Sequence, residues 1–175
     1  MYINEKMDAG DIIYQESEPI KDDDTAGTLH DRLAVKGAAL LARTVSDISS
    51  GKATARPQDH SKASFAPKIR KSDGRIDWNM SAEEIYRRVR GFNPWPGCYC
   101  ITPAGMLKIH TACVEKSGGS NGVPGSVLNI DKTGPLVQTG NGGLRLVEVQ
   151  PEGKKRMTGH AYAIGCRLQP GNMLS

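Results

Sequence analysis

The run Arg-Gly-Phe-Asn-Pro-Trp-Pro-Gly at residues 90–97 constrains the fold of this chain more than any other stretch. Proline fixes its own φ angle and has no backbone N–H, so a helix that arrives from upstream has to end before Pro94. The residue before a proline is pushed toward extended backbone, which holds Trp95 between two constrained neighbours. The pattern predicts a rigid, aromatic-filled elbow, an apolar plug that closes a small barrel or sandwich. Phe92, Pro94, Trp95 and Pro96 would join the arginine-bearing helix to the barrel. On that prediction, Trp95→Ala removes about 3–5 kcal/mol of domain stability.

The composition suits one globular domain, or one domain and part of another, in 175 residues. Apolar residues make up 38% and aromatic residues 5%, with 20 Gly and 10 Pro, which predicts a loop-rich, β-containing fold rather than a disordered chain. No apolar run approaches the length of about 18 residues that spans a membrane, and residues 1–6 lack a signal-peptide pattern. We therefore expect a cytoplasmic protein with no membrane partner.

The four cysteines lie at Cys98, Cys100, Cys113 and Cys166. A C-x-C pair followed by two isolated cysteines matches no zinc-binding spacing, and nothing in the sequence indicates secretion. We expect reduced cysteines and no metal.

Residues 1–20 contain two β-prone runs, at 2–3 and 11–14, on either side of a turn at Gly10. This pattern predicts a short β-hairpin. A two-stranded hairpin is barely stable alone, so we expect the chain to lack the sheet to which this hairpin would belong.

A long helix is predicted after the acidic run at residues 22–24. The run at residues 22–25 supplies an N-cap, its acidic charges favour the positive end of the helix dipole, and Gly51 can end the helix. No strand pattern follows in βαβ order, so the natural partner of its apolar stripe would be a sheet upstream of Met1. Without that sheet, we expect the stripe to pack irregularly, self-associate or fold onto the barrel. The stripe comprises Leu29, Leu33, Val35, Leu40, Leu41, Val45 and Ile48.

Residues 52–72 are rich in Ala, Thr, Pro, Gln, Asp, His and Ser, which is typical of a linker. A turn and a short strand are expected at residues 73–78. Ser81 and Glu84 then form a capping-box pattern that begins a second helix, which extends to about Gly91. Ile85 and Val89 are four residues apart and should face inward. The outward positions would then be basic, with Arg87, Arg88 and Arg90.

Beyond the elbow, apolar and polar residues alternate in five strand-like runs, at residues 98–101, 106–114, 125–130, 135–139 and 144–149. Turns are expected between them at residues 103–105, 117–123, 131–134 and 140–143, and a weak helix near residues 158–165. This spacing is typical of an antiparallel meander or a small barrel, and five strands with a helix fit an OB-like, partly open barrel.

Several segments, in their order and spacing, resemble the methionyl-tRNA formyltransferases. They are Arg-Ile-Asp-Trp at 75–78, the elbow at 90–97, Gln-Pro-Glu-Gly-Lys-Lys-Arg-Met at 150–157 and Pro-Gly at 170–171. Residues 7–11 and the helix start at 25–29 are similar to the end of that family's catalytic domain. Each motif is weak alone, but the ordered set is specific and covers essentially the whole chain.

The resemblance implies a mainly β fold with some α-helix. Residues 1–51 would be a β-hairpin and helix left from a Rossmann-like catalytic domain, and residues 52–72 a linker. Residues 73–175 would be an OB-like antiparallel barrel that holds tRNA. The family transfers a formyl group from 10-formyltetrahydrofolate to the methionine of initiator methionyl-tRNA, at the start of translation, and needs no metal.

Asp8 matches the aspartate of the family's D-x-G turn, which orients and charges a catalytic histidine and so helps to stabilise the oxyanion. This sequence has no Asn-x-His pair to match that histidine. None of its own four histidines, His30, His60, His110 and His160, lies at the right position. The resemblance therefore implies an N-terminally truncated chain that binds tRNA and is inactive alone.

Three basic clusters are the candidates for tRNA contact, because Lys and Arg give salt-dependent affinity for phosphates. If they share one face they form a track for a tRNA stem, and if they scatter they are ordinary solvated charge. A stand-alone OB-type RNA-binding module is an alternative, whereas a sugar-nucleotide formyltransferase would not need these clusters. No obligate protein partner is indicated. The clusters are Lys68, Arg70 and Lys71, then Arg87, Arg88 and Arg90, then Lys154, Lys155 and Arg156.

Overall fold

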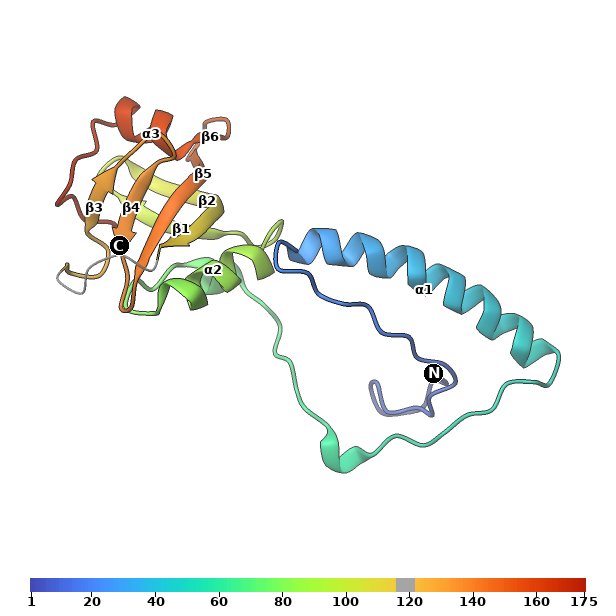
Figure 1. The fold of residues 1–175 in the computed structure, drawn as a ribbon. Coiled ribbons are helices and arrows are strands. Elements are labelled where there is room, and N and C mark those ends of the chain that lie inside the picture. The colour runs from blue at the N-terminus through green and yellow to red at the C-terminus, as the bar shows by residue number, and fades with distance from the viewer. Residues whose placement is uncertain (116–121) are drawn as a thin grey trace. The chain divides into compact units, whose positions relative to one another are not determined.

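The computed structural model describes residues 1–115 and 122–175 and contains two compact units, Met1–Lys68 and Ile69–Ser175 (Figure 1). Most of the turn expected at residues 117–123 lies outside the described residues. Among the described residues, no helix is both long and apolar enough to cross a membrane.

The first unit is built on α1 (Ala26–Ser49), whose ends agree with the sequence prediction. The Thr28 N–H donates to the Thr25 hydroxyl at 3.2 Å, and the Thr25 N–H donates back to the Thr28 hydroxyl at 3.0 Å. Gly51, just beyond the C-cap, has a φ of +71°, which a glycine adopts at little cost. No residue of α1 is buried, so its apolar stripe has no core to join within this unit.

The hairpin expected in residues 1–20 does not form. Within residues 1–68, all of which are described, strand-like pairing is limited to one bridge, between Ile12 and Arg56, with reciprocal N–H to oxygen distances of 2.9 Å. The Tyr2 N–H also donates to the Asp11 oxygen at 2.9 Å. Two short runs without a third strand bury too little to form a stable two-stranded ribbon, and Ile12 pairs with Arg56 instead. Later in this unit, η1 (His60–Lys62) is a single 3-10 turn.

An ionic cluster holds the start of α1 to the segment before it. The Arg32 guanidinium donates to both Asp24 carboxylate oxygens, at 2.5 and 2.6 Å, and to Glu18 at 2.9 Å. Lys36 lies 2.7 Å from the other Glu18 oxygen. The hydrogen bonds from Arg32 hold the pKa of the Asp24 carboxyl well below its usual range. Polar pairing, rather than apolar burial, therefore organises this end of the unit.

The second unit is a six-stranded antiparallel sheet with the strand order β1-β2-β5-β4-β3 and with β6 paired to β5 (Figure 1). All five predicted strand runs are present, but they do not form a simple meander, because β2 pairs with β5 and not with β3. The pairing of β2 with β5 includes register shifts around Thr111. The strands are β1 (Cys98–Thr102), β2 (Gly105–Glu115), β3 (Val127–Ile130), β4 (Pro135–Gln138), β5 (Gly143–Pro151) and β6 (Met157–Thr158).

The last residues of the chain link the two outer strands of this sheet. Ser175 exchanges two backbone hydrogen bonds with Ile101 of β1, at 2.5 and 2.8 Å. On the other side, the Val127 N–H of β3 donates to the Asn172 oxygen at 2.9 Å, and the Leu174 N–H donates to the Gly125 oxygen at 2.8 Å. The segment thus satisfies backbone groups on both edges and closes the sheet into a barrel.

One core fills this barrel, with α2 (Ala82–Gly91) and α3 (Gly159–Gly165) at its two ends (Figure 1). The predicted capping box is present: the Glu84 N–H donates to the Ser81 hydroxyl at 3.3 Å, and the Ser81 N–H donates to the Glu84 carboxylate at 2.9 Å. Ile85 and Val89 face inward, as expected, and both are buried. The strand expected near residues 75–78 is reduced to one bridge from Arg75.

The elbow at residues 90–97 forms, but the prediction that Trp95 is a buried part of the plug is wrong. Trp95 is 54% exposed, whereas Trp78, which is 4% exposed, fills the core. Phe92 takes the core side of the elbow and the next residues turn outward. The elbow is fixed by its backbone: a Cβ at Gly74 would collide with the Gly97 carbonyl oxygen, so glycine is needed for this close approach.

Candidate nucleic-acid interface

The first basic cluster is divided between the two units. Lys68 is the last residue of the first unit, and Arg70 and Lys71 belong to the second. All three are exposed. Arg70 and Lys71 lie at the start of η2 (Lys71–Gly74), where the Arg70 N–H donates to the Asp73 carboxylate at 2.7 Å. Their side chains are therefore presented to solvent by a capped, ordered turn.

The second cluster, on α2, is less outward than predicted. Arg87 is exposed and lies 4.0 Å from Glu83, a weak surface pair. Arg88 is half-buried, donates to the Asp73 oxygen at 2.7 Å, and lies 5.5 Å from the Phe92 ring centroid. Arg90 is also half-buried, with its guanidinium 4.8 Å from the Tyr86 ring centroid. Arg88 and Arg90 support the fold because their long stems cover apolar surface, and Arg87 is left as the outward charge.

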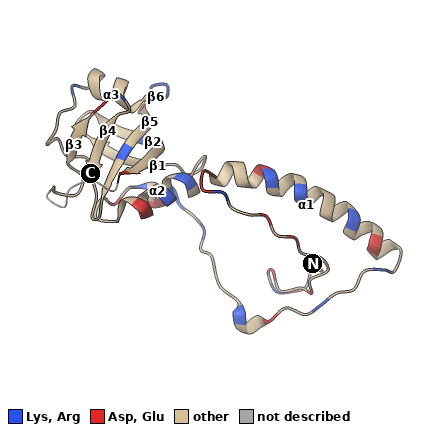
Figure 2. Cartoon of the chain, in the orientation of Figure 1, with Lys and Arg blue, Asp and Glu red and all other residues tan. Residues whose placement is uncertain are grey.

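The Arg88 contact also ties α2 to η2. Arg88 donates to the backbone oxygen of Asp73, in the turn that begins at Lys71. The third cluster lies elsewhere, in the turn between β5 and β6, where Lys154, Lys155 and Arg156 are exposed. Figure 2 shows this turn and α2 at opposite ends of the barrel. Arg156 is partly neutralised by Glu148, at 3.7 Å.

Asp8 is exposed, and its φ of +53° makes it one of two described non-glycine residues with positive φ. The adjacent loop is held by Gln58, whose side-chain amide donates to the oxygens of Asp8, at 2.9 Å, and of Gly10, at 2.7 Å. Among the described residues, no histidine hydrogen-bonds the Asp8 carboxylate. Asp8 therefore lies in an ordered turn without the partner that the family resemblance would give it.

The histidines have other contacts. His30 lies 3.4 Å from Asp31 on the exposed side of α1, and His60 is exposed in η1. His110 bonds Gln150 at 3.0 Å and His160 bonds the Asp131 oxygen at 2.7 Å. Each lies at the surface or at the edge of the core.

The cysteines offer neither a disulfide nor a metal site. All four are free, and the described residues contain no group of three or more potential ligands that could hold a metal ion. Burial raises the pKa of the Cys100 thiol to about 12 and that of Cys98 to about 11, so both stay protonated at neutral pH.

Sequence reasoning overlooked the outward residues of the strands. Tyr99 lies between buried Cys98 and Cys100, and Lys108 lies between buried Leu107 and Ile109. The period-2 pattern used to find these strands also identifies the two residues as outward-facing. Lys108 stands alone on its strand, so it is not part of any run of basic residues.

Two family models match the chain in succession. The model described as formyl transferase matches residues 1–45, and the model described as formyl transferase, C-terminal domain, matches residues 68–167. The chain belongs to the formyl transferase family. The resemblance to methionyl-tRNA formyltransferases is thereby confirmed, and the family is one of transferases that move formyl groups.

Curated relatives carry the name methionyl-tRNA formyltransferase. That of Bacillus velezensis is 41% identical over 175 residues, which cover 99% of this chain and 55% of the relative. That of Heliobacterium modesticaldum is 40% identical over 178 residues, covering 98% and 56%. The chain therefore spans about half the length of the curated relatives that it matches.

Solved structures of HypX from Aquifex aeolicus share the fold. One in complex with tetrahydrofolic acid has a TM-score of 0.65 and 17% identity, and the match covers 91% of this chain and 28% of HypX. A variant of the same protein has a TM-score of 0.66 and 18% identity, with 97% and 30% covered. At this identity the likeness concerns the fold, and it agrees with the predicted mainly antiparallel β class.

Proposed function

We propose that this chain is the part of a methionyl-tRNA formyltransferase that holds the initiator methionyl-tRNA. The observation that carries the proposal is 41% identity to enzymes of that name over 99% of the chain. In this proposal residues 73–175 form the tRNA-binding domain, residues 52–72 a linker, and residues 1–51 the end of the catalytic domain. The protein would act in the cytoplasm, at the start of translation.

The formyl donor in this proposal is 10-formyltetrahydrofolate. HypX, which shares the fold, has been solved with tetrahydrofolic acid, and this supports a folate-linked donor. The described residues do not fit a donor site of their own, because the family's catalytic set is represented by Asp8 without a histidine contact. We therefore derive no catalytic step from this chain and assign it the binding of tRNA.

The binding role rests on the basic residues of the second unit. Arg70 and Lys71 are exposed at η2, Arg87 is exposed on α2, and the β5–β6 turn adds a further basic site. Lysine and arginine contacts to phosphates contribute affinity that is largely independent of sequence and falls with salt. Lys68 belongs to the first unit and would add charge at the linker.

Competition binding tests this proposal. The purified chain should bind an initiator tRNA transcript more tightly than an elongator tRNA transcript, with an affinity that falls as salt rises. Matching affinities for both tRNAs and for an unrelated RNA hairpin would instead describe a general RNA-binding module.

A formylation assay tests the catalytic half of the proposal. With methionyl initiator tRNA and 10-formyltetrahydrofolate, the 175-residue chain alone should give no formyl-methionyl-tRNA, and a full-length relative is the positive control. Formyl transfer by the purified chain would contradict the assignment of tRNA binding without catalysis.

A further inference from the structure

A row of four residues runs across the outside of the barrel, perpendicular to the strands. Arg75 pairs with Tyr99 of β1, Tyr99 pairs with Lys108 of β2, and Lys108 pairs with Gln150 of β5. Side chains of directly paired residues on neighbouring strands lie on the same face of a sheet. At the usual strand spacing of about 4.8 Å, three pairings extend over roughly 14 Å.

This row faces solvent. Ile76, Leu107 and Val149, which adjoin Arg75, Lys108 and Gln150 along the chain, are buried in the core. The row residues alternate with such buried neighbours: Arg75 and Lys108 are exposed, and Tyr99 and Gln150 are half-buried. The row is therefore an ordered surface of two cations, one aromatic ring and one amide.

The row connects the two basic regions that otherwise lie at opposite ends of the barrel. Arg75 directly follows η2, which carries Arg70 and Lys71. At the other end, the Gln150 side-chain amide donates to the Lys154 oxygen at 2.8 Å. His110, on the same strand as Lys108, bonds the other side of Gln150 at 3.0 Å. Gln150 is thus held in place from two directions.

The two cations of the row, Arg75 and Lys108, take no part in the ion pairs that stabilise the described part of the fold. Among the ion pairs of the described residues, none includes Arg75 or Lys108, whereas Arg88 and Arg156 have partners. The nearby carboxylates are engaged elsewhere: Asp77 accepts from Asn79, at 2.8 Å from its amide, and Glu148 pairs with Arg156. Two cations held by the sheet and directed to water are suited to an anionic ligand.

We infer that this row is a contact surface for the phosphate backbone of the tRNA, continuous from η2 to the β5–β6 turn. The inference rests on the proposed function, since it names the surface by which that tRNA is held. Arg75 and Lys108 contact phosphates, Tyr99 contacts the ribose edge or an adjacent base, and Gln150 links the row to the β5–β6 turn. Aromatic rings beside cations are the usual means of holding a nucleic-acid strand without reading its sequence.

The test compares charge-removing variants of the full chain. Arg75→Gln and Lys108→Gln are measured against Lys132→Gln, which removes another exposed lysine, from the turn between β3 and β4. Binding to an initiator tRNA transcript is measured over a series of salt concentrations. Each row variant should bind about 3- to 10-fold more weakly and lower the salt slope by about one, as expected for one lost phosphate contact. Lys132→Gln should match the parent chain.

The outcomes separate the inference from the proposed function. If initiator tRNA is preferred but both row variants behave like Lys132→Gln, the inference fails and the proposed function stands. If the chain shows no preference for initiator tRNA but the row variants still weaken RNA binding, the inference stands and the proposed function fails. A chain that binds no RNA overturns both. Thermal unfolding of each variant shows whether the fold is retained, which we expect at outward positions.

Discussion

The two units of this chain differ in how their apolar residues are used. In Ile69–Ser175, one buried cluster joins the strands to α2, α3 and the closing segment. In Met1–Lys68, where every residue is described, Ile13 is the one buried hydrophobic side chain. A 24-residue helix in that unit buries none of its residues. The ends of α1 are therefore defined by its caps, but the helix has no core to pack against. Because helices in proteins gain most of their stability from packing, α1 should be less stable than the helices of the second unit.

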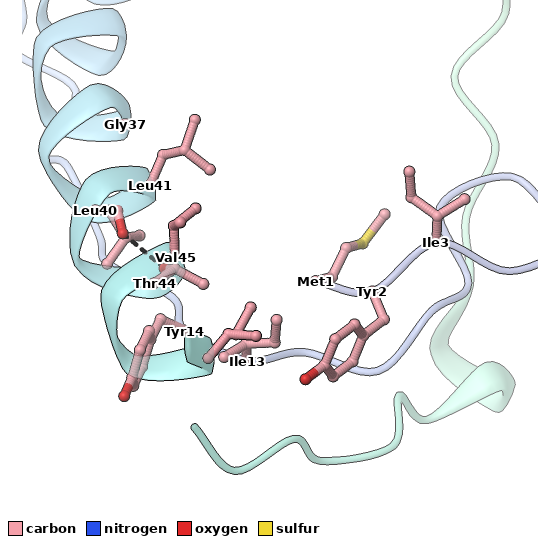
Figure 3. Close-up of a pocket in the computed structure, with 11 residues that line it drawn as sticks. Met1, Tyr2, Ile3, Ile13, Tyr14, Gly37, Leu40, Leu41, Thr44 and Val45 are labelled. Carbon is pink, nitrogen blue, oxygen red and sulfur yellow. Dashed lines mark hydrogen bonds between the residues drawn. The ribbon is translucent and has the colours of Figure 1, made fainter. Parts of the chain in front are cut away.

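The apolar stripe of α1 borders an open depression of about 500 Å³ (Figure 3). Leu40, Leu41 and Val45 line it from the helix, and Tyr2 and Ile13 line it from the start of the chain. That the uncovered stripe packs irregularly, self-associates or folds onto the barrel stays a prediction.

The largest difference between a buried and an exposed side chain is expected for the two tryptophans of the second unit. Trp78→Ala removes a large aromatic side chain from the core and should cost about 3–5 kcal/mol of the stability of the second unit. Trp95→Ala, its matched control at 54% exposure, should change stability by less than about 0.5 kcal/mol. Urea unfolding followed by fluorescence of the remaining tryptophan measures both. Equal losses would restore the plug prediction for Trp95.

Two leucine substitutions, one in each unit, compare the stability cost of losing a buried and an exposed side chain. Leu144→Ala, at a fully buried position of β5, should cost about 2–5 kcal/mol. Leu41→Ala, at 63% exposure on α1, should cost less than about 0.5 kcal/mol, and alanine is also a good helix former. Unfolding followed by circular dichroism tests this difference. A large loss from Leu41→Ala would mean that the stripe is packed in solution.

The smallest expected change in stability concerns the ionic cluster around Asp24 at the start of α1. Because the folded pKa of Asp24 is depressed, its contribution is complete at neutral pH and is lost as pH falls below the unfolded value of about 3.9. Asp24→Asn should weaken the first turns of α1 at pH 7 and reduce their loss on acidification, as followed by the NMR shifts of their amides. Asp23→Asn, which is exposed, is the control and should keep the acid response of the parent chain.

Local signals predicted local structure well. The Ser81–Glu84 capping box, the Thr25 cap and the strand alternation each depend on residues a few positions apart, and each is present. The pairing of β2 with β5 and the closure by residues 171–175 depend on residues far apart in sequence, which periodicity does not address. Sequence also could not decide which tryptophan is buried, because Phe92 and Trp78 compete with Trp95 for the core.

The sequence indicates which basic residues are candidates for the site, but it does not indicate how they are arranged in space. The basic residues were identified from sequence, but α2 turns Arg88 and Arg90 toward internal partners and leaves Arg87 outward. The cross-strand row was missed because its members are far apart in sequence and become neighbours through strand register. Asp8 was placed in a turn correctly, but the hairpin around it does not form.

Amide hydrogen exchange of the free 175-residue chain tests the contrast between the units most directly. Amides in β2 and β5 should exchange through global unfolding, with the slowest rates of the chain. Amides in α1 should exchange by local opening, orders of magnitude faster, because no core protects the helix. Protection of α1 equal to that of β5 would contradict the account, since it would require a buried partner for the stripe that the first unit does not contain.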